Sequence, residues 1–526
     1  MGIRRRTFLG ASAAALAAPG IARAASVLKF IPQADITILD PVWTTAYVTR
    51  NHGFLVFDTL YGTDATFNAS PQMVEGHVVD NGGRQWTMKL RDGLKWHDGA
   101  KVLARDCVAS IRRWGARDAF GATVLQFADE IAAVDDRTIR FRLKQPFPLL
   151  PTALGKAASN SCPMMPERLA MTDPFKQVTE MVGSGPFRWN ARERVVGSLA
   201  VYEKFHGYVP RPGGVASGTA GPKIVHYDRV EWHVIPDAAT KTAAMQSGET
   251  DWWENPPADN ALVLKADRGL VTRVLDPTGL MGCMRLNQLV APFDNPAVRR
   301  VVLDAVRQED YMVAVAGTDP SMWHVPTGIF APGTPMASDV GLKRFTEAKD
   351  FAKLKTALEK AGYKGEKIVL LLPTDLPELK AEAEVSADMF RRMGFEVDAQ
   401  ASDWGTVVQR RASMKPVAAG GWSVFSTFWT GLDQLSPAGH VFLRGQGKAG
   451  GQPGWPSSPA IEALRNQWLA AKDVTTQKEL AVKLQQQAFI DVPYIPLGQF
   501  FQNTSYKKSI TGVLDGIPVF WNVRPA

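Results

Sequence analysis

Residues 86–114 read WTMKLRDGLKWHDGAKVLARDCVASIRRW, and this stretch decides the fold class of the region around it. Apolar and polar residues alternate at Trp86, Met88 and Leu90, a pattern typical of a half-buried strand. Further along, apolar residues recur near helical spacing, at Val102, Val108, Ile111 and Trp114. A second alternation at Ile139, Phe141 and Leu143 predicts another strand. We therefore expect strands and a helix packed together here.

A strand, a helix and a second strand are also predicted later in the chain. The apolar run Ile368–Leu372 predicts a buried strand, and a helix is expected from about Leu379 to Met393. Gly394 is the expected end of that helix, because glycine adopts left-handed backbone angles easily. Phe395–Ala399 predicts the next strand. This order implies a parallel strand pair with a right-handed crossover, and hence an α/β fold.

Two local patterns carry further structural predictions. Asn295-Pro296 is a strong helix start, because Asn caps free backbone N–H groups and Pro fits the first helical position. We expect that helix to turn Arg299 and Arg300 outward. Trp252-Trp253 is expected to pack between subdomains.

Length and composition limit the possible functions. A chain of 526 residues is too long for one core, so two or three domains are expected. The net charge of +8 arises from 60 basic and 52 acidic residues without a basic tract, which argues against nucleic acid as a partner. The three cysteines are widely spaced, and the eight histidines show no metal-ligand spacing. We expect no cofactor, no metal site and no catalytic motif; a disulfide between two of Cys107, Cys162 and Cys283 stays open.

The first 24 residues have the composition of a secretory signal peptide. Arg4, Arg5 and Arg6 precede an apolar, alanine-rich stretch that is too short to span a membrane, which takes about 20 residues. Ala22-Arg23-Ala24 matches a cleavage site. The run Arg5-Arg6-Thr7-Phe8-Leu9 resembles the twin-arginine motif. We therefore expect export, by the twin-arginine route, into the periplasm.

Short motifs accompany the opening stretch in a fixed order. They are Leu39-Asp40-Pro41, Gly183-Ser184-Gly185-Pro186-Phe187, Met245-Gln246-Ser247-Gly248-Glu249-Thr250-Asp251, Asn287 with Pro292-Phe293-Asp294-Asn295-Pro296 and Val298-Arg299, Ala361-Gly362-Tyr363, and Pro493-Tyr494-Ile495-Pro496-Leu497. Together with residues 86–114 they resemble family 5 of the bacterial extracellular solute-binding proteins, the class of oligopeptide, dipeptide and nickel receptors. The resemblance covers nearly the whole chain after the signal peptide.

The resemblance implies a class II periplasmic binding protein fold, with two α/β lobes, an extra subdomain and a ligand cleft between the lobes. The expected division is a signal peptide at residues 1–24, lobe I at 25–62, 183–277 and 495–526, the extra subdomain at 63–182, and lobe II at 278–494. In the family pattern His97-Asp98-Gly99 is a β-turn without chemistry.

The implied function is capture of a peptide-like or other small organic solute by hinge closure, followed by delivery to an inner-membrane ABC permease. We expect a monomer with no enzymatic activity. Three alternatives stay open from the sequence alone: a receptor for a nickel or other metal chelate, a secreted hydrolase, and a receptor that presents its ligand to a sensor.

The stretch from Asp403 to Arg444 supplies most candidate cleft residues, because its aromatic side chains are separated by glycines that allow close approach. The aromatic candidates are Trp404, Trp422, Phe425 and Trp429, with core packing as the alternative, and Phe428 is expected in the core. The other candidates are Asn287, Asp433, Arg444, Trp43 and Tyr47. Asn287 is alternatively a turn cap. Arg444 is either a carboxylate ligand or, as we expect, a surface residue, and Asp433 is either a displaced ligand anchor or, as we expect, a solvated loop acid.

One departure from the family pattern bears on the ligand. In peptide-binding members an Asp three residues after the Trp of the Gly421-Trp422 landmark holds the ligand's α-ammonium, whereas this chain has Phe425 there. A buried ammonium without a carboxylate partner is costly. The sequence therefore predicts an aromatic-walled site for a less cationic or differently held solute.

Overall fold

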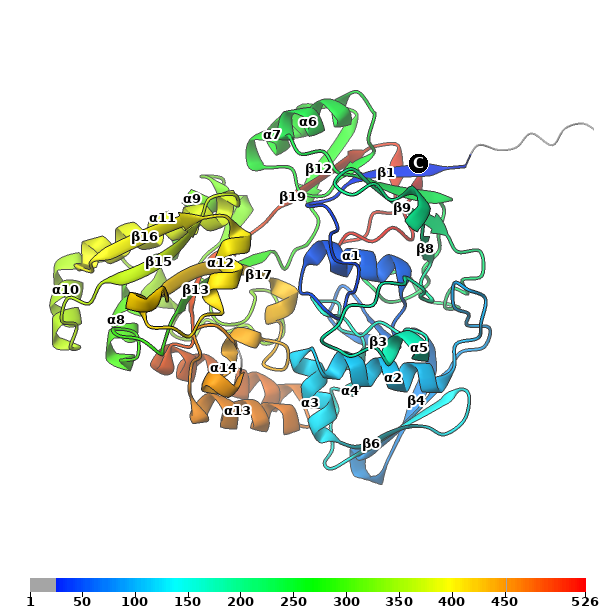
Figure 1. The fold of residues 1–526 in the computed structure, drawn as a ribbon, viewed down its shortest axis with the longest axis horizontal. Coiled ribbons are helices and arrows are strands. Elements are labelled where there is room, and N and C mark those ends of the chain that lie inside the picture. Colours follow the sequence, from blue (N-terminus) through cyan, green and yellow to red (C-terminus); the bar gives the residue numbers. More distant parts are fainter. Residues whose placement is uncertain (1–24, 451) are drawn as a thin grey trace, which may run out of the picture.

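The computed structural model describes residues 25–450 and 452–526, so the predicted signal peptide lies outside the described residues. Two bodies lie side by side in Figure 1. One contains the early part of the chain and its final segment, and the other contains mainly the chain between Leu280 and Phe500. No helix in the described part is long and apolar enough to cross a membrane.

The sheet of the first body is assembled from distant segments. Its strand order is β12 (Leu270–Val274), β19 (Asn503–Lys507), β11 (Trp252–Trp253), β1 (Val27–Ile31), β10 (Arg229–His233), β9 (Leu199–Lys204) and β8 (Phe187–Trp189). Its helices are α1 (Tyr47–Val56), α6 (Ala238–Gln246) and α7 (Ala258–Ala266), and β20 (Ile510–Thr511) pairs with β21 (Arg524–Pro525) nearby. Because β1 pairs in parallel with both β10 and β11, it joins chain segments more than 200 residues apart.

The stretch quoted at the outset forms a strand and a helix, as predicted. The smaller sheet around it has the order β4 (Val74–Asp80), β5 (Gln85–Leu90), β7 (Thr138–Leu143) and β6 (Ala128–Ala133). The pair β2 (Tyr61–Thr63) and β3 (Ala69–Pro71) packs on α4 (Leu150–Leu154). The other helices of this region are α2 (Ala104–Gly115), α3 (Ala119–Phe127) and α5 (Glu167–Ala170). The helix α2 packs on β6 and β7, which buries Ile111 and Trp114 completely.

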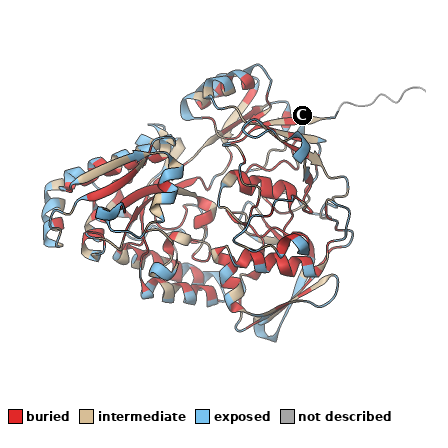
Figure 2. Ribbon diagram, in the orientation of Figure 1, coloured by how far each residue is buried: buried red, intermediate tan, exposed pale blue. Residues whose placement is uncertain are grey.

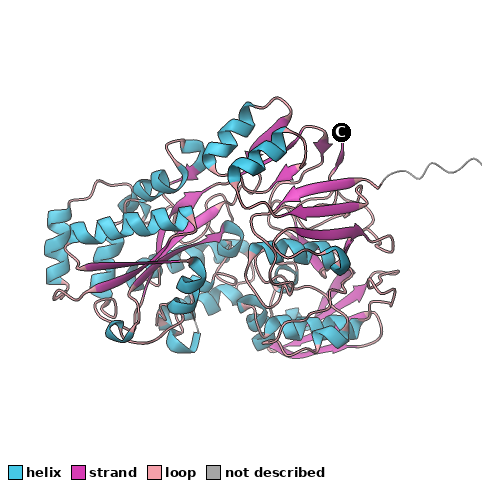
Figure 3. Cartoon of the chain, turned by 45° about the horizontal axis from the view of Figure 1, so that its top comes forward, coloured by secondary structure: helices cyan, strands magenta, loops and turns pink. Residues whose placement is uncertain are grey.

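The second body has its own sheet, with the order β14 (Trp323–His324), β18 (Ile495–Phe500), β13 (Leu280–Leu286), β17 (Val424–Thr430), β15 (Ile368–Pro373) and β16 (Val397–Ser402). Its helices are α8 (Pro296–Ala305), α9 (Gln308–Ala316), α10 (Phe351–Lys360), α11 (Pro377–Met393), α12 (Trp404–Arg411), α13 (Pro459–Ala470) and α14 (Val474–Asp491). The predicted β-α-β unit is confirmed, because β15 and β16 are parallel and α11 packs on β15 (Figure 3). Gly394 ends α11 at φ 96°.

The division into lobes and subdomain stays a prediction, and the sheets differ from it at one boundary. The prediction places residues 495–526 in lobe I, but β18 pairs antiparallel with β13 and β14 in the second sheet. The chain therefore leaves the second sheet after Phe500 and joins the first at Asn503. All residues of β18 are buried, so the sequence pattern of this strand does not indicate which of the two sheets it joins.

Two predictions about side chains are wrong. Arg299 does not point outward: it is 6% exposed, and its guanidinium donates to the backbone carbonyls of Phe293 and Asp491. Trp252 and Trp253 do not pack between subdomains. They form β11 within the first sheet, where Trp252 joins one core cluster and Trp253 another, because successive strand residues face opposite sides.

A buried ion pair joins the segment before α1 to α2. Arg113 donates to both oxygens of Asp40, through Nη1 at 3.2 Å and Nη2 at 2.6 Å. The backbone N–H groups of Val42 and Val178 donate to the same carboxylate at 3.0 and 2.9 Å. The charge is therefore compensated on several sides, which a buried carboxylate requires. The pair therefore links the Leu39-Asp40-Pro41 motif to the long opening stretch, because Asp40 lies in the first and Arg113 in the second.

Buried residues form the centres of both bodies and almost the whole of α1 (Figure 2). All three cysteines lie in the described part of the chain, and each is a buried free thiol. One polar group stands out in the second core. Glu382 on α11 is fully buried, and neither of its carboxylate oxygens has a hydrogen-bond partner among the described residues. Burial raises the pKa of Glu382 well above its ordinary 4.5, with a smaller contribution from Glu378.

We predict that Glu382→Gln stabilises the protein at alkaline pH more than at acidic pH. Because the pKa of Glu382 is raised by folding, its favourable contribution is complete below the unfolded pKa of 4.5 and is lost as the pH rises. The loss amounts to about 1.4 kcal/mol for each pH unit over which only the folded state keeps the proton. The melting temperature of the variant, measured by circular dichroism, should exceed the wild-type value at pH 8 by about 2 °C or more, and by less at pH 5.

Glu384→Gln is the matched control, because Glu384 lies on the exposed face of the same helix beside Lys380. It should show no such pH-dependent difference. An equal effect of Glu382→Gln at both pH values would mean that Glu382 is not held protonated.

Candidate functional site

A cavity of about 440 Å³ lies between the two bodies. Residues between Ala116 and Gln126 and between Lys156 and Asn160 line one side, and residues between Arg411 and Pro453 line the other. This volume is within the range of about 300–1,000 Å³ that is usual for small-molecule sites. Because the two walls come from distant parts of the chain, the cavity exists only when both bodies are in place.

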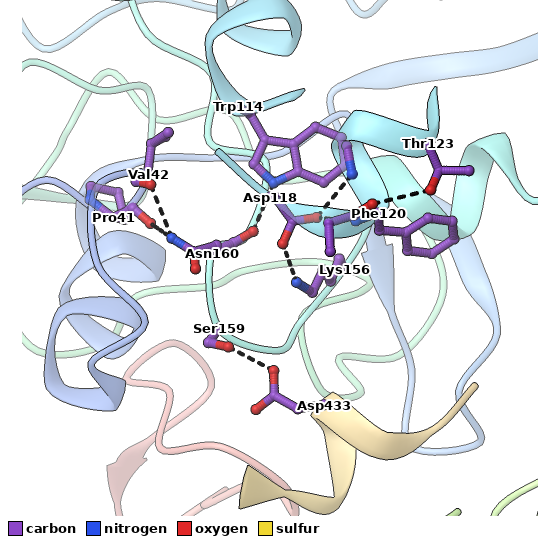
Figure 4. Close-up of polar contacts among 12 residues, drawn as sticks. Pro41, Val42, Trp114, Asp118, Phe120, Thr123, Lys156, Ser159, Asn160 and Asp433 are labelled. Atoms are coloured by element: carbon purple, nitrogen blue, oxygen red, sulfur yellow. Dashed lines mark hydrogen bonds and ion pairs between the residues drawn. The ribbon is translucent and has the colours of Figure 1, made fainter. Parts of the chain in front are cut away.

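The wall from the first body is organised by an ion pair at the start of α3. Asp118 caps this helix by accepting from the backbone N–H groups of Phe120 at 2.8 Å and Gly121 at 2.9 Å. Its second oxygen accepts from Lys156 Nζ at 2.5 Å, as Figure 4 shows. Asp118 is 5% exposed, so its charge is satisfied within the wall.

The wall from the second body includes one face of β17. Phe425 and Trp429 are four positions apart in that strand, so they lie on the same face, and both line the cavity. Arg411, at the end of α12, places its guanidinium over the ring of Phe425 at 5.3 Å and over that of Trp404 at 5.2 Å. Stacking on aromatic faces stabilises a guanidinium that has little water around it.

Asp433 connects the two bodies. Its carboxylate accepts from the hydroxyl groups of Ser159 at 2.6 Å, Thr430 at 2.8 Å and Tyr47 at 3.2 Å. Figure 4 shows the bond from Ser159, which crosses from one body to the other. The prediction of a solvated loop acid is wrong, because Asp433 is 7% exposed. Hydroxyl groups of three separate segments donate to the carboxylate where water would do so at an exposed site.

Arg444 also reaches across the cavity. It donates through Nη2 to the backbone carbonyl of Ala119 at 2.9 Å. The expectation of a surface position is wrong, since Arg444 is partly buried in the cavity wall and burial lowers its pKa. Burial likewise lowers the pKa of Arg411 to about 10, which leaves it protonated at neutral pH.

The structure brings five of the predicted site residues to this region and places the others nearby. Phe425, Trp429, Asp433 and Arg444 line the main cavity, and Tyr47 donates to Asp433 from α1. The other four lie outside the lining. The ring of Trp404 stacks with Arg411, and the backbone carbonyl of Trp43 accepts a hydrogen bond from Arg117. Trp422 packs on Phe425, and Asn287 lies at the start of the loop after β13. Phe428 is partly buried and packs on Phe500.

Asn287 has the geometry of a structural cap. It is 0% exposed, its amide donates to the carbonyl of Trp422 at 2.8 Å, and its oxygen accepts from the backbone of Leu289 at 3.1 Å. These bonds fix the loop that follows β13 against the start of β17. The alternative that the sequence left open, a turn-capping role, accounts for all of them.

Sequence reasoning missed most of the cavity lining, including five residues that decide its charge and hydrogen bonding. They are Arg117, Asp118, Lys156, Ser159 and Arg411. Asp118 had a usable local pattern, since an Asp before an apolar helical stretch predicts an N-cap. The other four had none, because their contacts depend on how separate segments pack: Ser159 meets its acceptor 274 residues away, and Lys156 meets its acceptor 38 residues away.

A second cavity of about 200 Å³ adjoins the first. The two share Lys156, Asp433 and Gly439 in their linings. Most of the second lining is apolar, including Phe67, Leu149, Met336, Leu432 and Trp468. Within residues 25–450 and 452–526, no group of three or more His, Cys, Asp or Glu side chains is placed to hold a metal ion.

Comparisons with known proteins agree with this architecture. A probable peptide ABC transporter periplasmic-binding protein of Sinorhizobium fredii is 35% identical over 524 residues, which cover 98% of each chain. Two solved structures superpose with 20% sequence identity over 95% of this chain. The binding protein AgaA of A. tumefaciens, in complex with agropinic acid, gives a TM-score of 0.78 over 99% of its own chain, and DppA of Helicobacter pylori, in complex with the peptide STSA, gives 0.77 over 98%.

The fold prediction is thus confirmed as that of the class II periplasmic binding proteins. Residues 68–439 match the middle region of the family described as bacterial extracellular solute-binding proteins, family 5. Members of this family are transport receptors, so the hydrolase alternative is set aside. The chain belongs to family 5 of the bacterial extracellular solute-binding proteins.

Proposed function

We propose that this protein is the periplasmic solute-binding component of a peptide-type ABC importer, and that it holds a peptide-like solute in the cavity between its two bodies. The observation that carries the proposal is the cavity of about 440 Å³, with walls supplied by both bodies. The relatives support it, because one is a probable peptide ABC transporter periplasmic-binding protein and another structure holds the peptide STSA.

Closure around a solute is the step that couples binding to transport. A ligand shifts the balance toward the closed form only through contacts that the open form lacks. Contacts made to both walls satisfy this condition, because opening would break those on one side. The closed form presents a different outer surface, which an inner-membrane permease can recognise. The protein acts as a monomer in this scheme and releases its solute unchanged.

Mass spectrometry of the natively purified protein should identify a bound small molecule, because closed receptors enclose their ligands. Adding that molecule back to stripped protein should reduce the radius of gyration measured by small-angle X-ray scattering. At 100 times its Kd it should also add about 2.7 kcal/mol to the stability. An unchanged radius with every candidate solute, or recovery of a chemically altered solute, would refute capture by closure.

Asp433→Ala should weaken the closed form even without a solute. The change removes an acceptor from the hydroxyl groups of Tyr47, Ser159 and Thr430 and so cuts two contacts with the first body. Loss of a buried hydrogen-bond partner costs about 1–3 kcal/mol. We expect a lower melting temperature and a larger radius of gyration. Asp388→Ala, on the exposed face of α11, is the control and should change neither; the idea fails if both variants behave like the wild type.

Export by the twin-arginine route belongs to the same proposal and rests on Arg5-Arg6 in the sequence. Replacing both residues with Lys should leave precursor in the cytoplasm, because that route depends on the arginine pair. Cell fractionation with immunoblotting measures the distribution. Periplasmic accumulation at the wild-type level would assign the protein to another export route.

A further inference from the structure

The main cavity carries an excess of positive charge. Its charged lining residues are Arg117, Lys156, Arg411, Arg444, Asp118 and Asp433. The two acids already have partners: Asp118 pairs with Lys156 at 2.5 Å, and Asp433 accepts from three hydroxyl groups. The hydroxyl groups leave the charge of Asp433 in place, so four basic and two acidic side chains give the lining a formal net charge of +2.

These arginines have no ion-pair partner in the part of the chain that the structure describes. Arg117 and Arg444 each donate one bond of 2.9 Å to a backbone carbonyl, and among the described residues Arg411 donates none and stacks on Phe425. A guanidinium has five N–H donors, so most of these donors are unused. The Nε atoms of Arg117 and Arg444 are buried without a hydrogen-bond partner among the described residues, so an anion that enters the cavity offers them an acceptor.

The position of Arg411 reverses the charge expected for a site that holds an ammonium group. It stacks on Phe425 of β17, whose side chain has no charge to pair with an ammonium group. A solute with a free ammonium group would therefore face a guanidinium and an aromatic ring there. A carboxylate matches the planar donor fork of the same guanidinium.

The adjoining apolar cavity adds a second requirement. Its volume is about 200 Å³, and it meets the main cavity at Lys156, Asp433 and Gly439. Leu149, Met336 and Trp468 are among its walls. An apolar group placed there would leave water and gain close contacts.

We infer that the solute is a peptide-like acid with a blocked or absent amino terminus, whose carboxylate binds the cavity arginines and whose apolar side group enters the adjoining cavity. This inference rests on the proposed function and specifies the chemistry of its ligand.

Four matched probes test it by titration calorimetry on the full mature chain: N-acetyl-glycyl-phenylalanine, its carboxyl-terminal amide, glycyl-phenylalanine with a free amine, and N-acetyl-glycyl-alanine. The acetylated acid should bind most tightly. The amide should bind about tenfold or more weakly because it lacks the charge for the arginines. The free amine should also bind more weakly. The alanine probe should bind about tenfold more weakly than the phenylalanine probe, because its side group is small.

Two variants assign these effects to the two cavities. Arg411→Gln should weaken binding of the acetylated acid by about tenfold or more, while the affinity for the amide stays unchanged. Its control is Arg410→Gln, on the same helix, where Arg410 donates to the carbonyl of Gly421 away from the cavity lining. Thr152→Trp should fill the apolar cavity and weaken the phenylalanine probe but not the alanine probe. Melting curves establish that each variant is folded, and Arg411→Lys should restore part of the affinity.

The outcomes separate the inference from the proposed function. Equal affinity for the acid and the amide, or tighter binding of the free-amine peptide, overturns the inference and leaves a peptide receptor in place. An unchanged affinity in folded Arg411→Gln does the same. If no probe binds and the native protein carries no solute, the proposed function itself fails.

Discussion

The carboxylate of Asp433 is the point on which the arrangement of the two bodies depends. It accepts hydrogen bonds from hydroxyl groups of α1, of the segment that follows α4, and of the end of β17. A buried carboxylate needs several donors to offset its lost hydration. If one of these segments moved away, the carboxylate would lose a donor or become exposed to water. Beside it, the Asp118–Lys156 pair fixes the opposite wall. These two carboxylates therefore shape the cavity and are already occupied before a solute enters.

That occupancy changes what the cavity can bind. An acid with unused acceptors would attract an ammonium group, whereas here the unused groups are the donors of Arg117, Arg411 and Arg444. Phe425 acts in the same direction, because its ring supports the guanidinium of Arg411. Family membership and ligand chemistry are thus set by different residues. The motifs that define the family build the lobes, and a few side chains at their boundary select the solute.

The sequence predicted what local patterns determine. Alternation and helical spacing located β5, α2, and the β15–α11–β16 unit, and Asn295 caps α8 as expected. It failed where distant neighbours decide the outcome. Arg299 is buried because the end of α14 offers it a backbone carbonyl. Asp433 and Arg444 look like surface residues until residues more than 250 positions away fold against them.

Charge on both sides of the cavity also bears on how closure is controlled. Arg117 belongs to the first body, and Arg411 and Arg444 belong to the second, so closure brings like charges into one space of reduced dielectric. The hydrogen bonds from Ser159 to Asp433 and from Arg444 to Ala119 favour closure, while this repulsion opposes it. An anion between the walls converts the repulsion into attraction on both sides at once. The solute's charge then supplies the differential stabilisation that distinguishes a loaded receptor from an empty one.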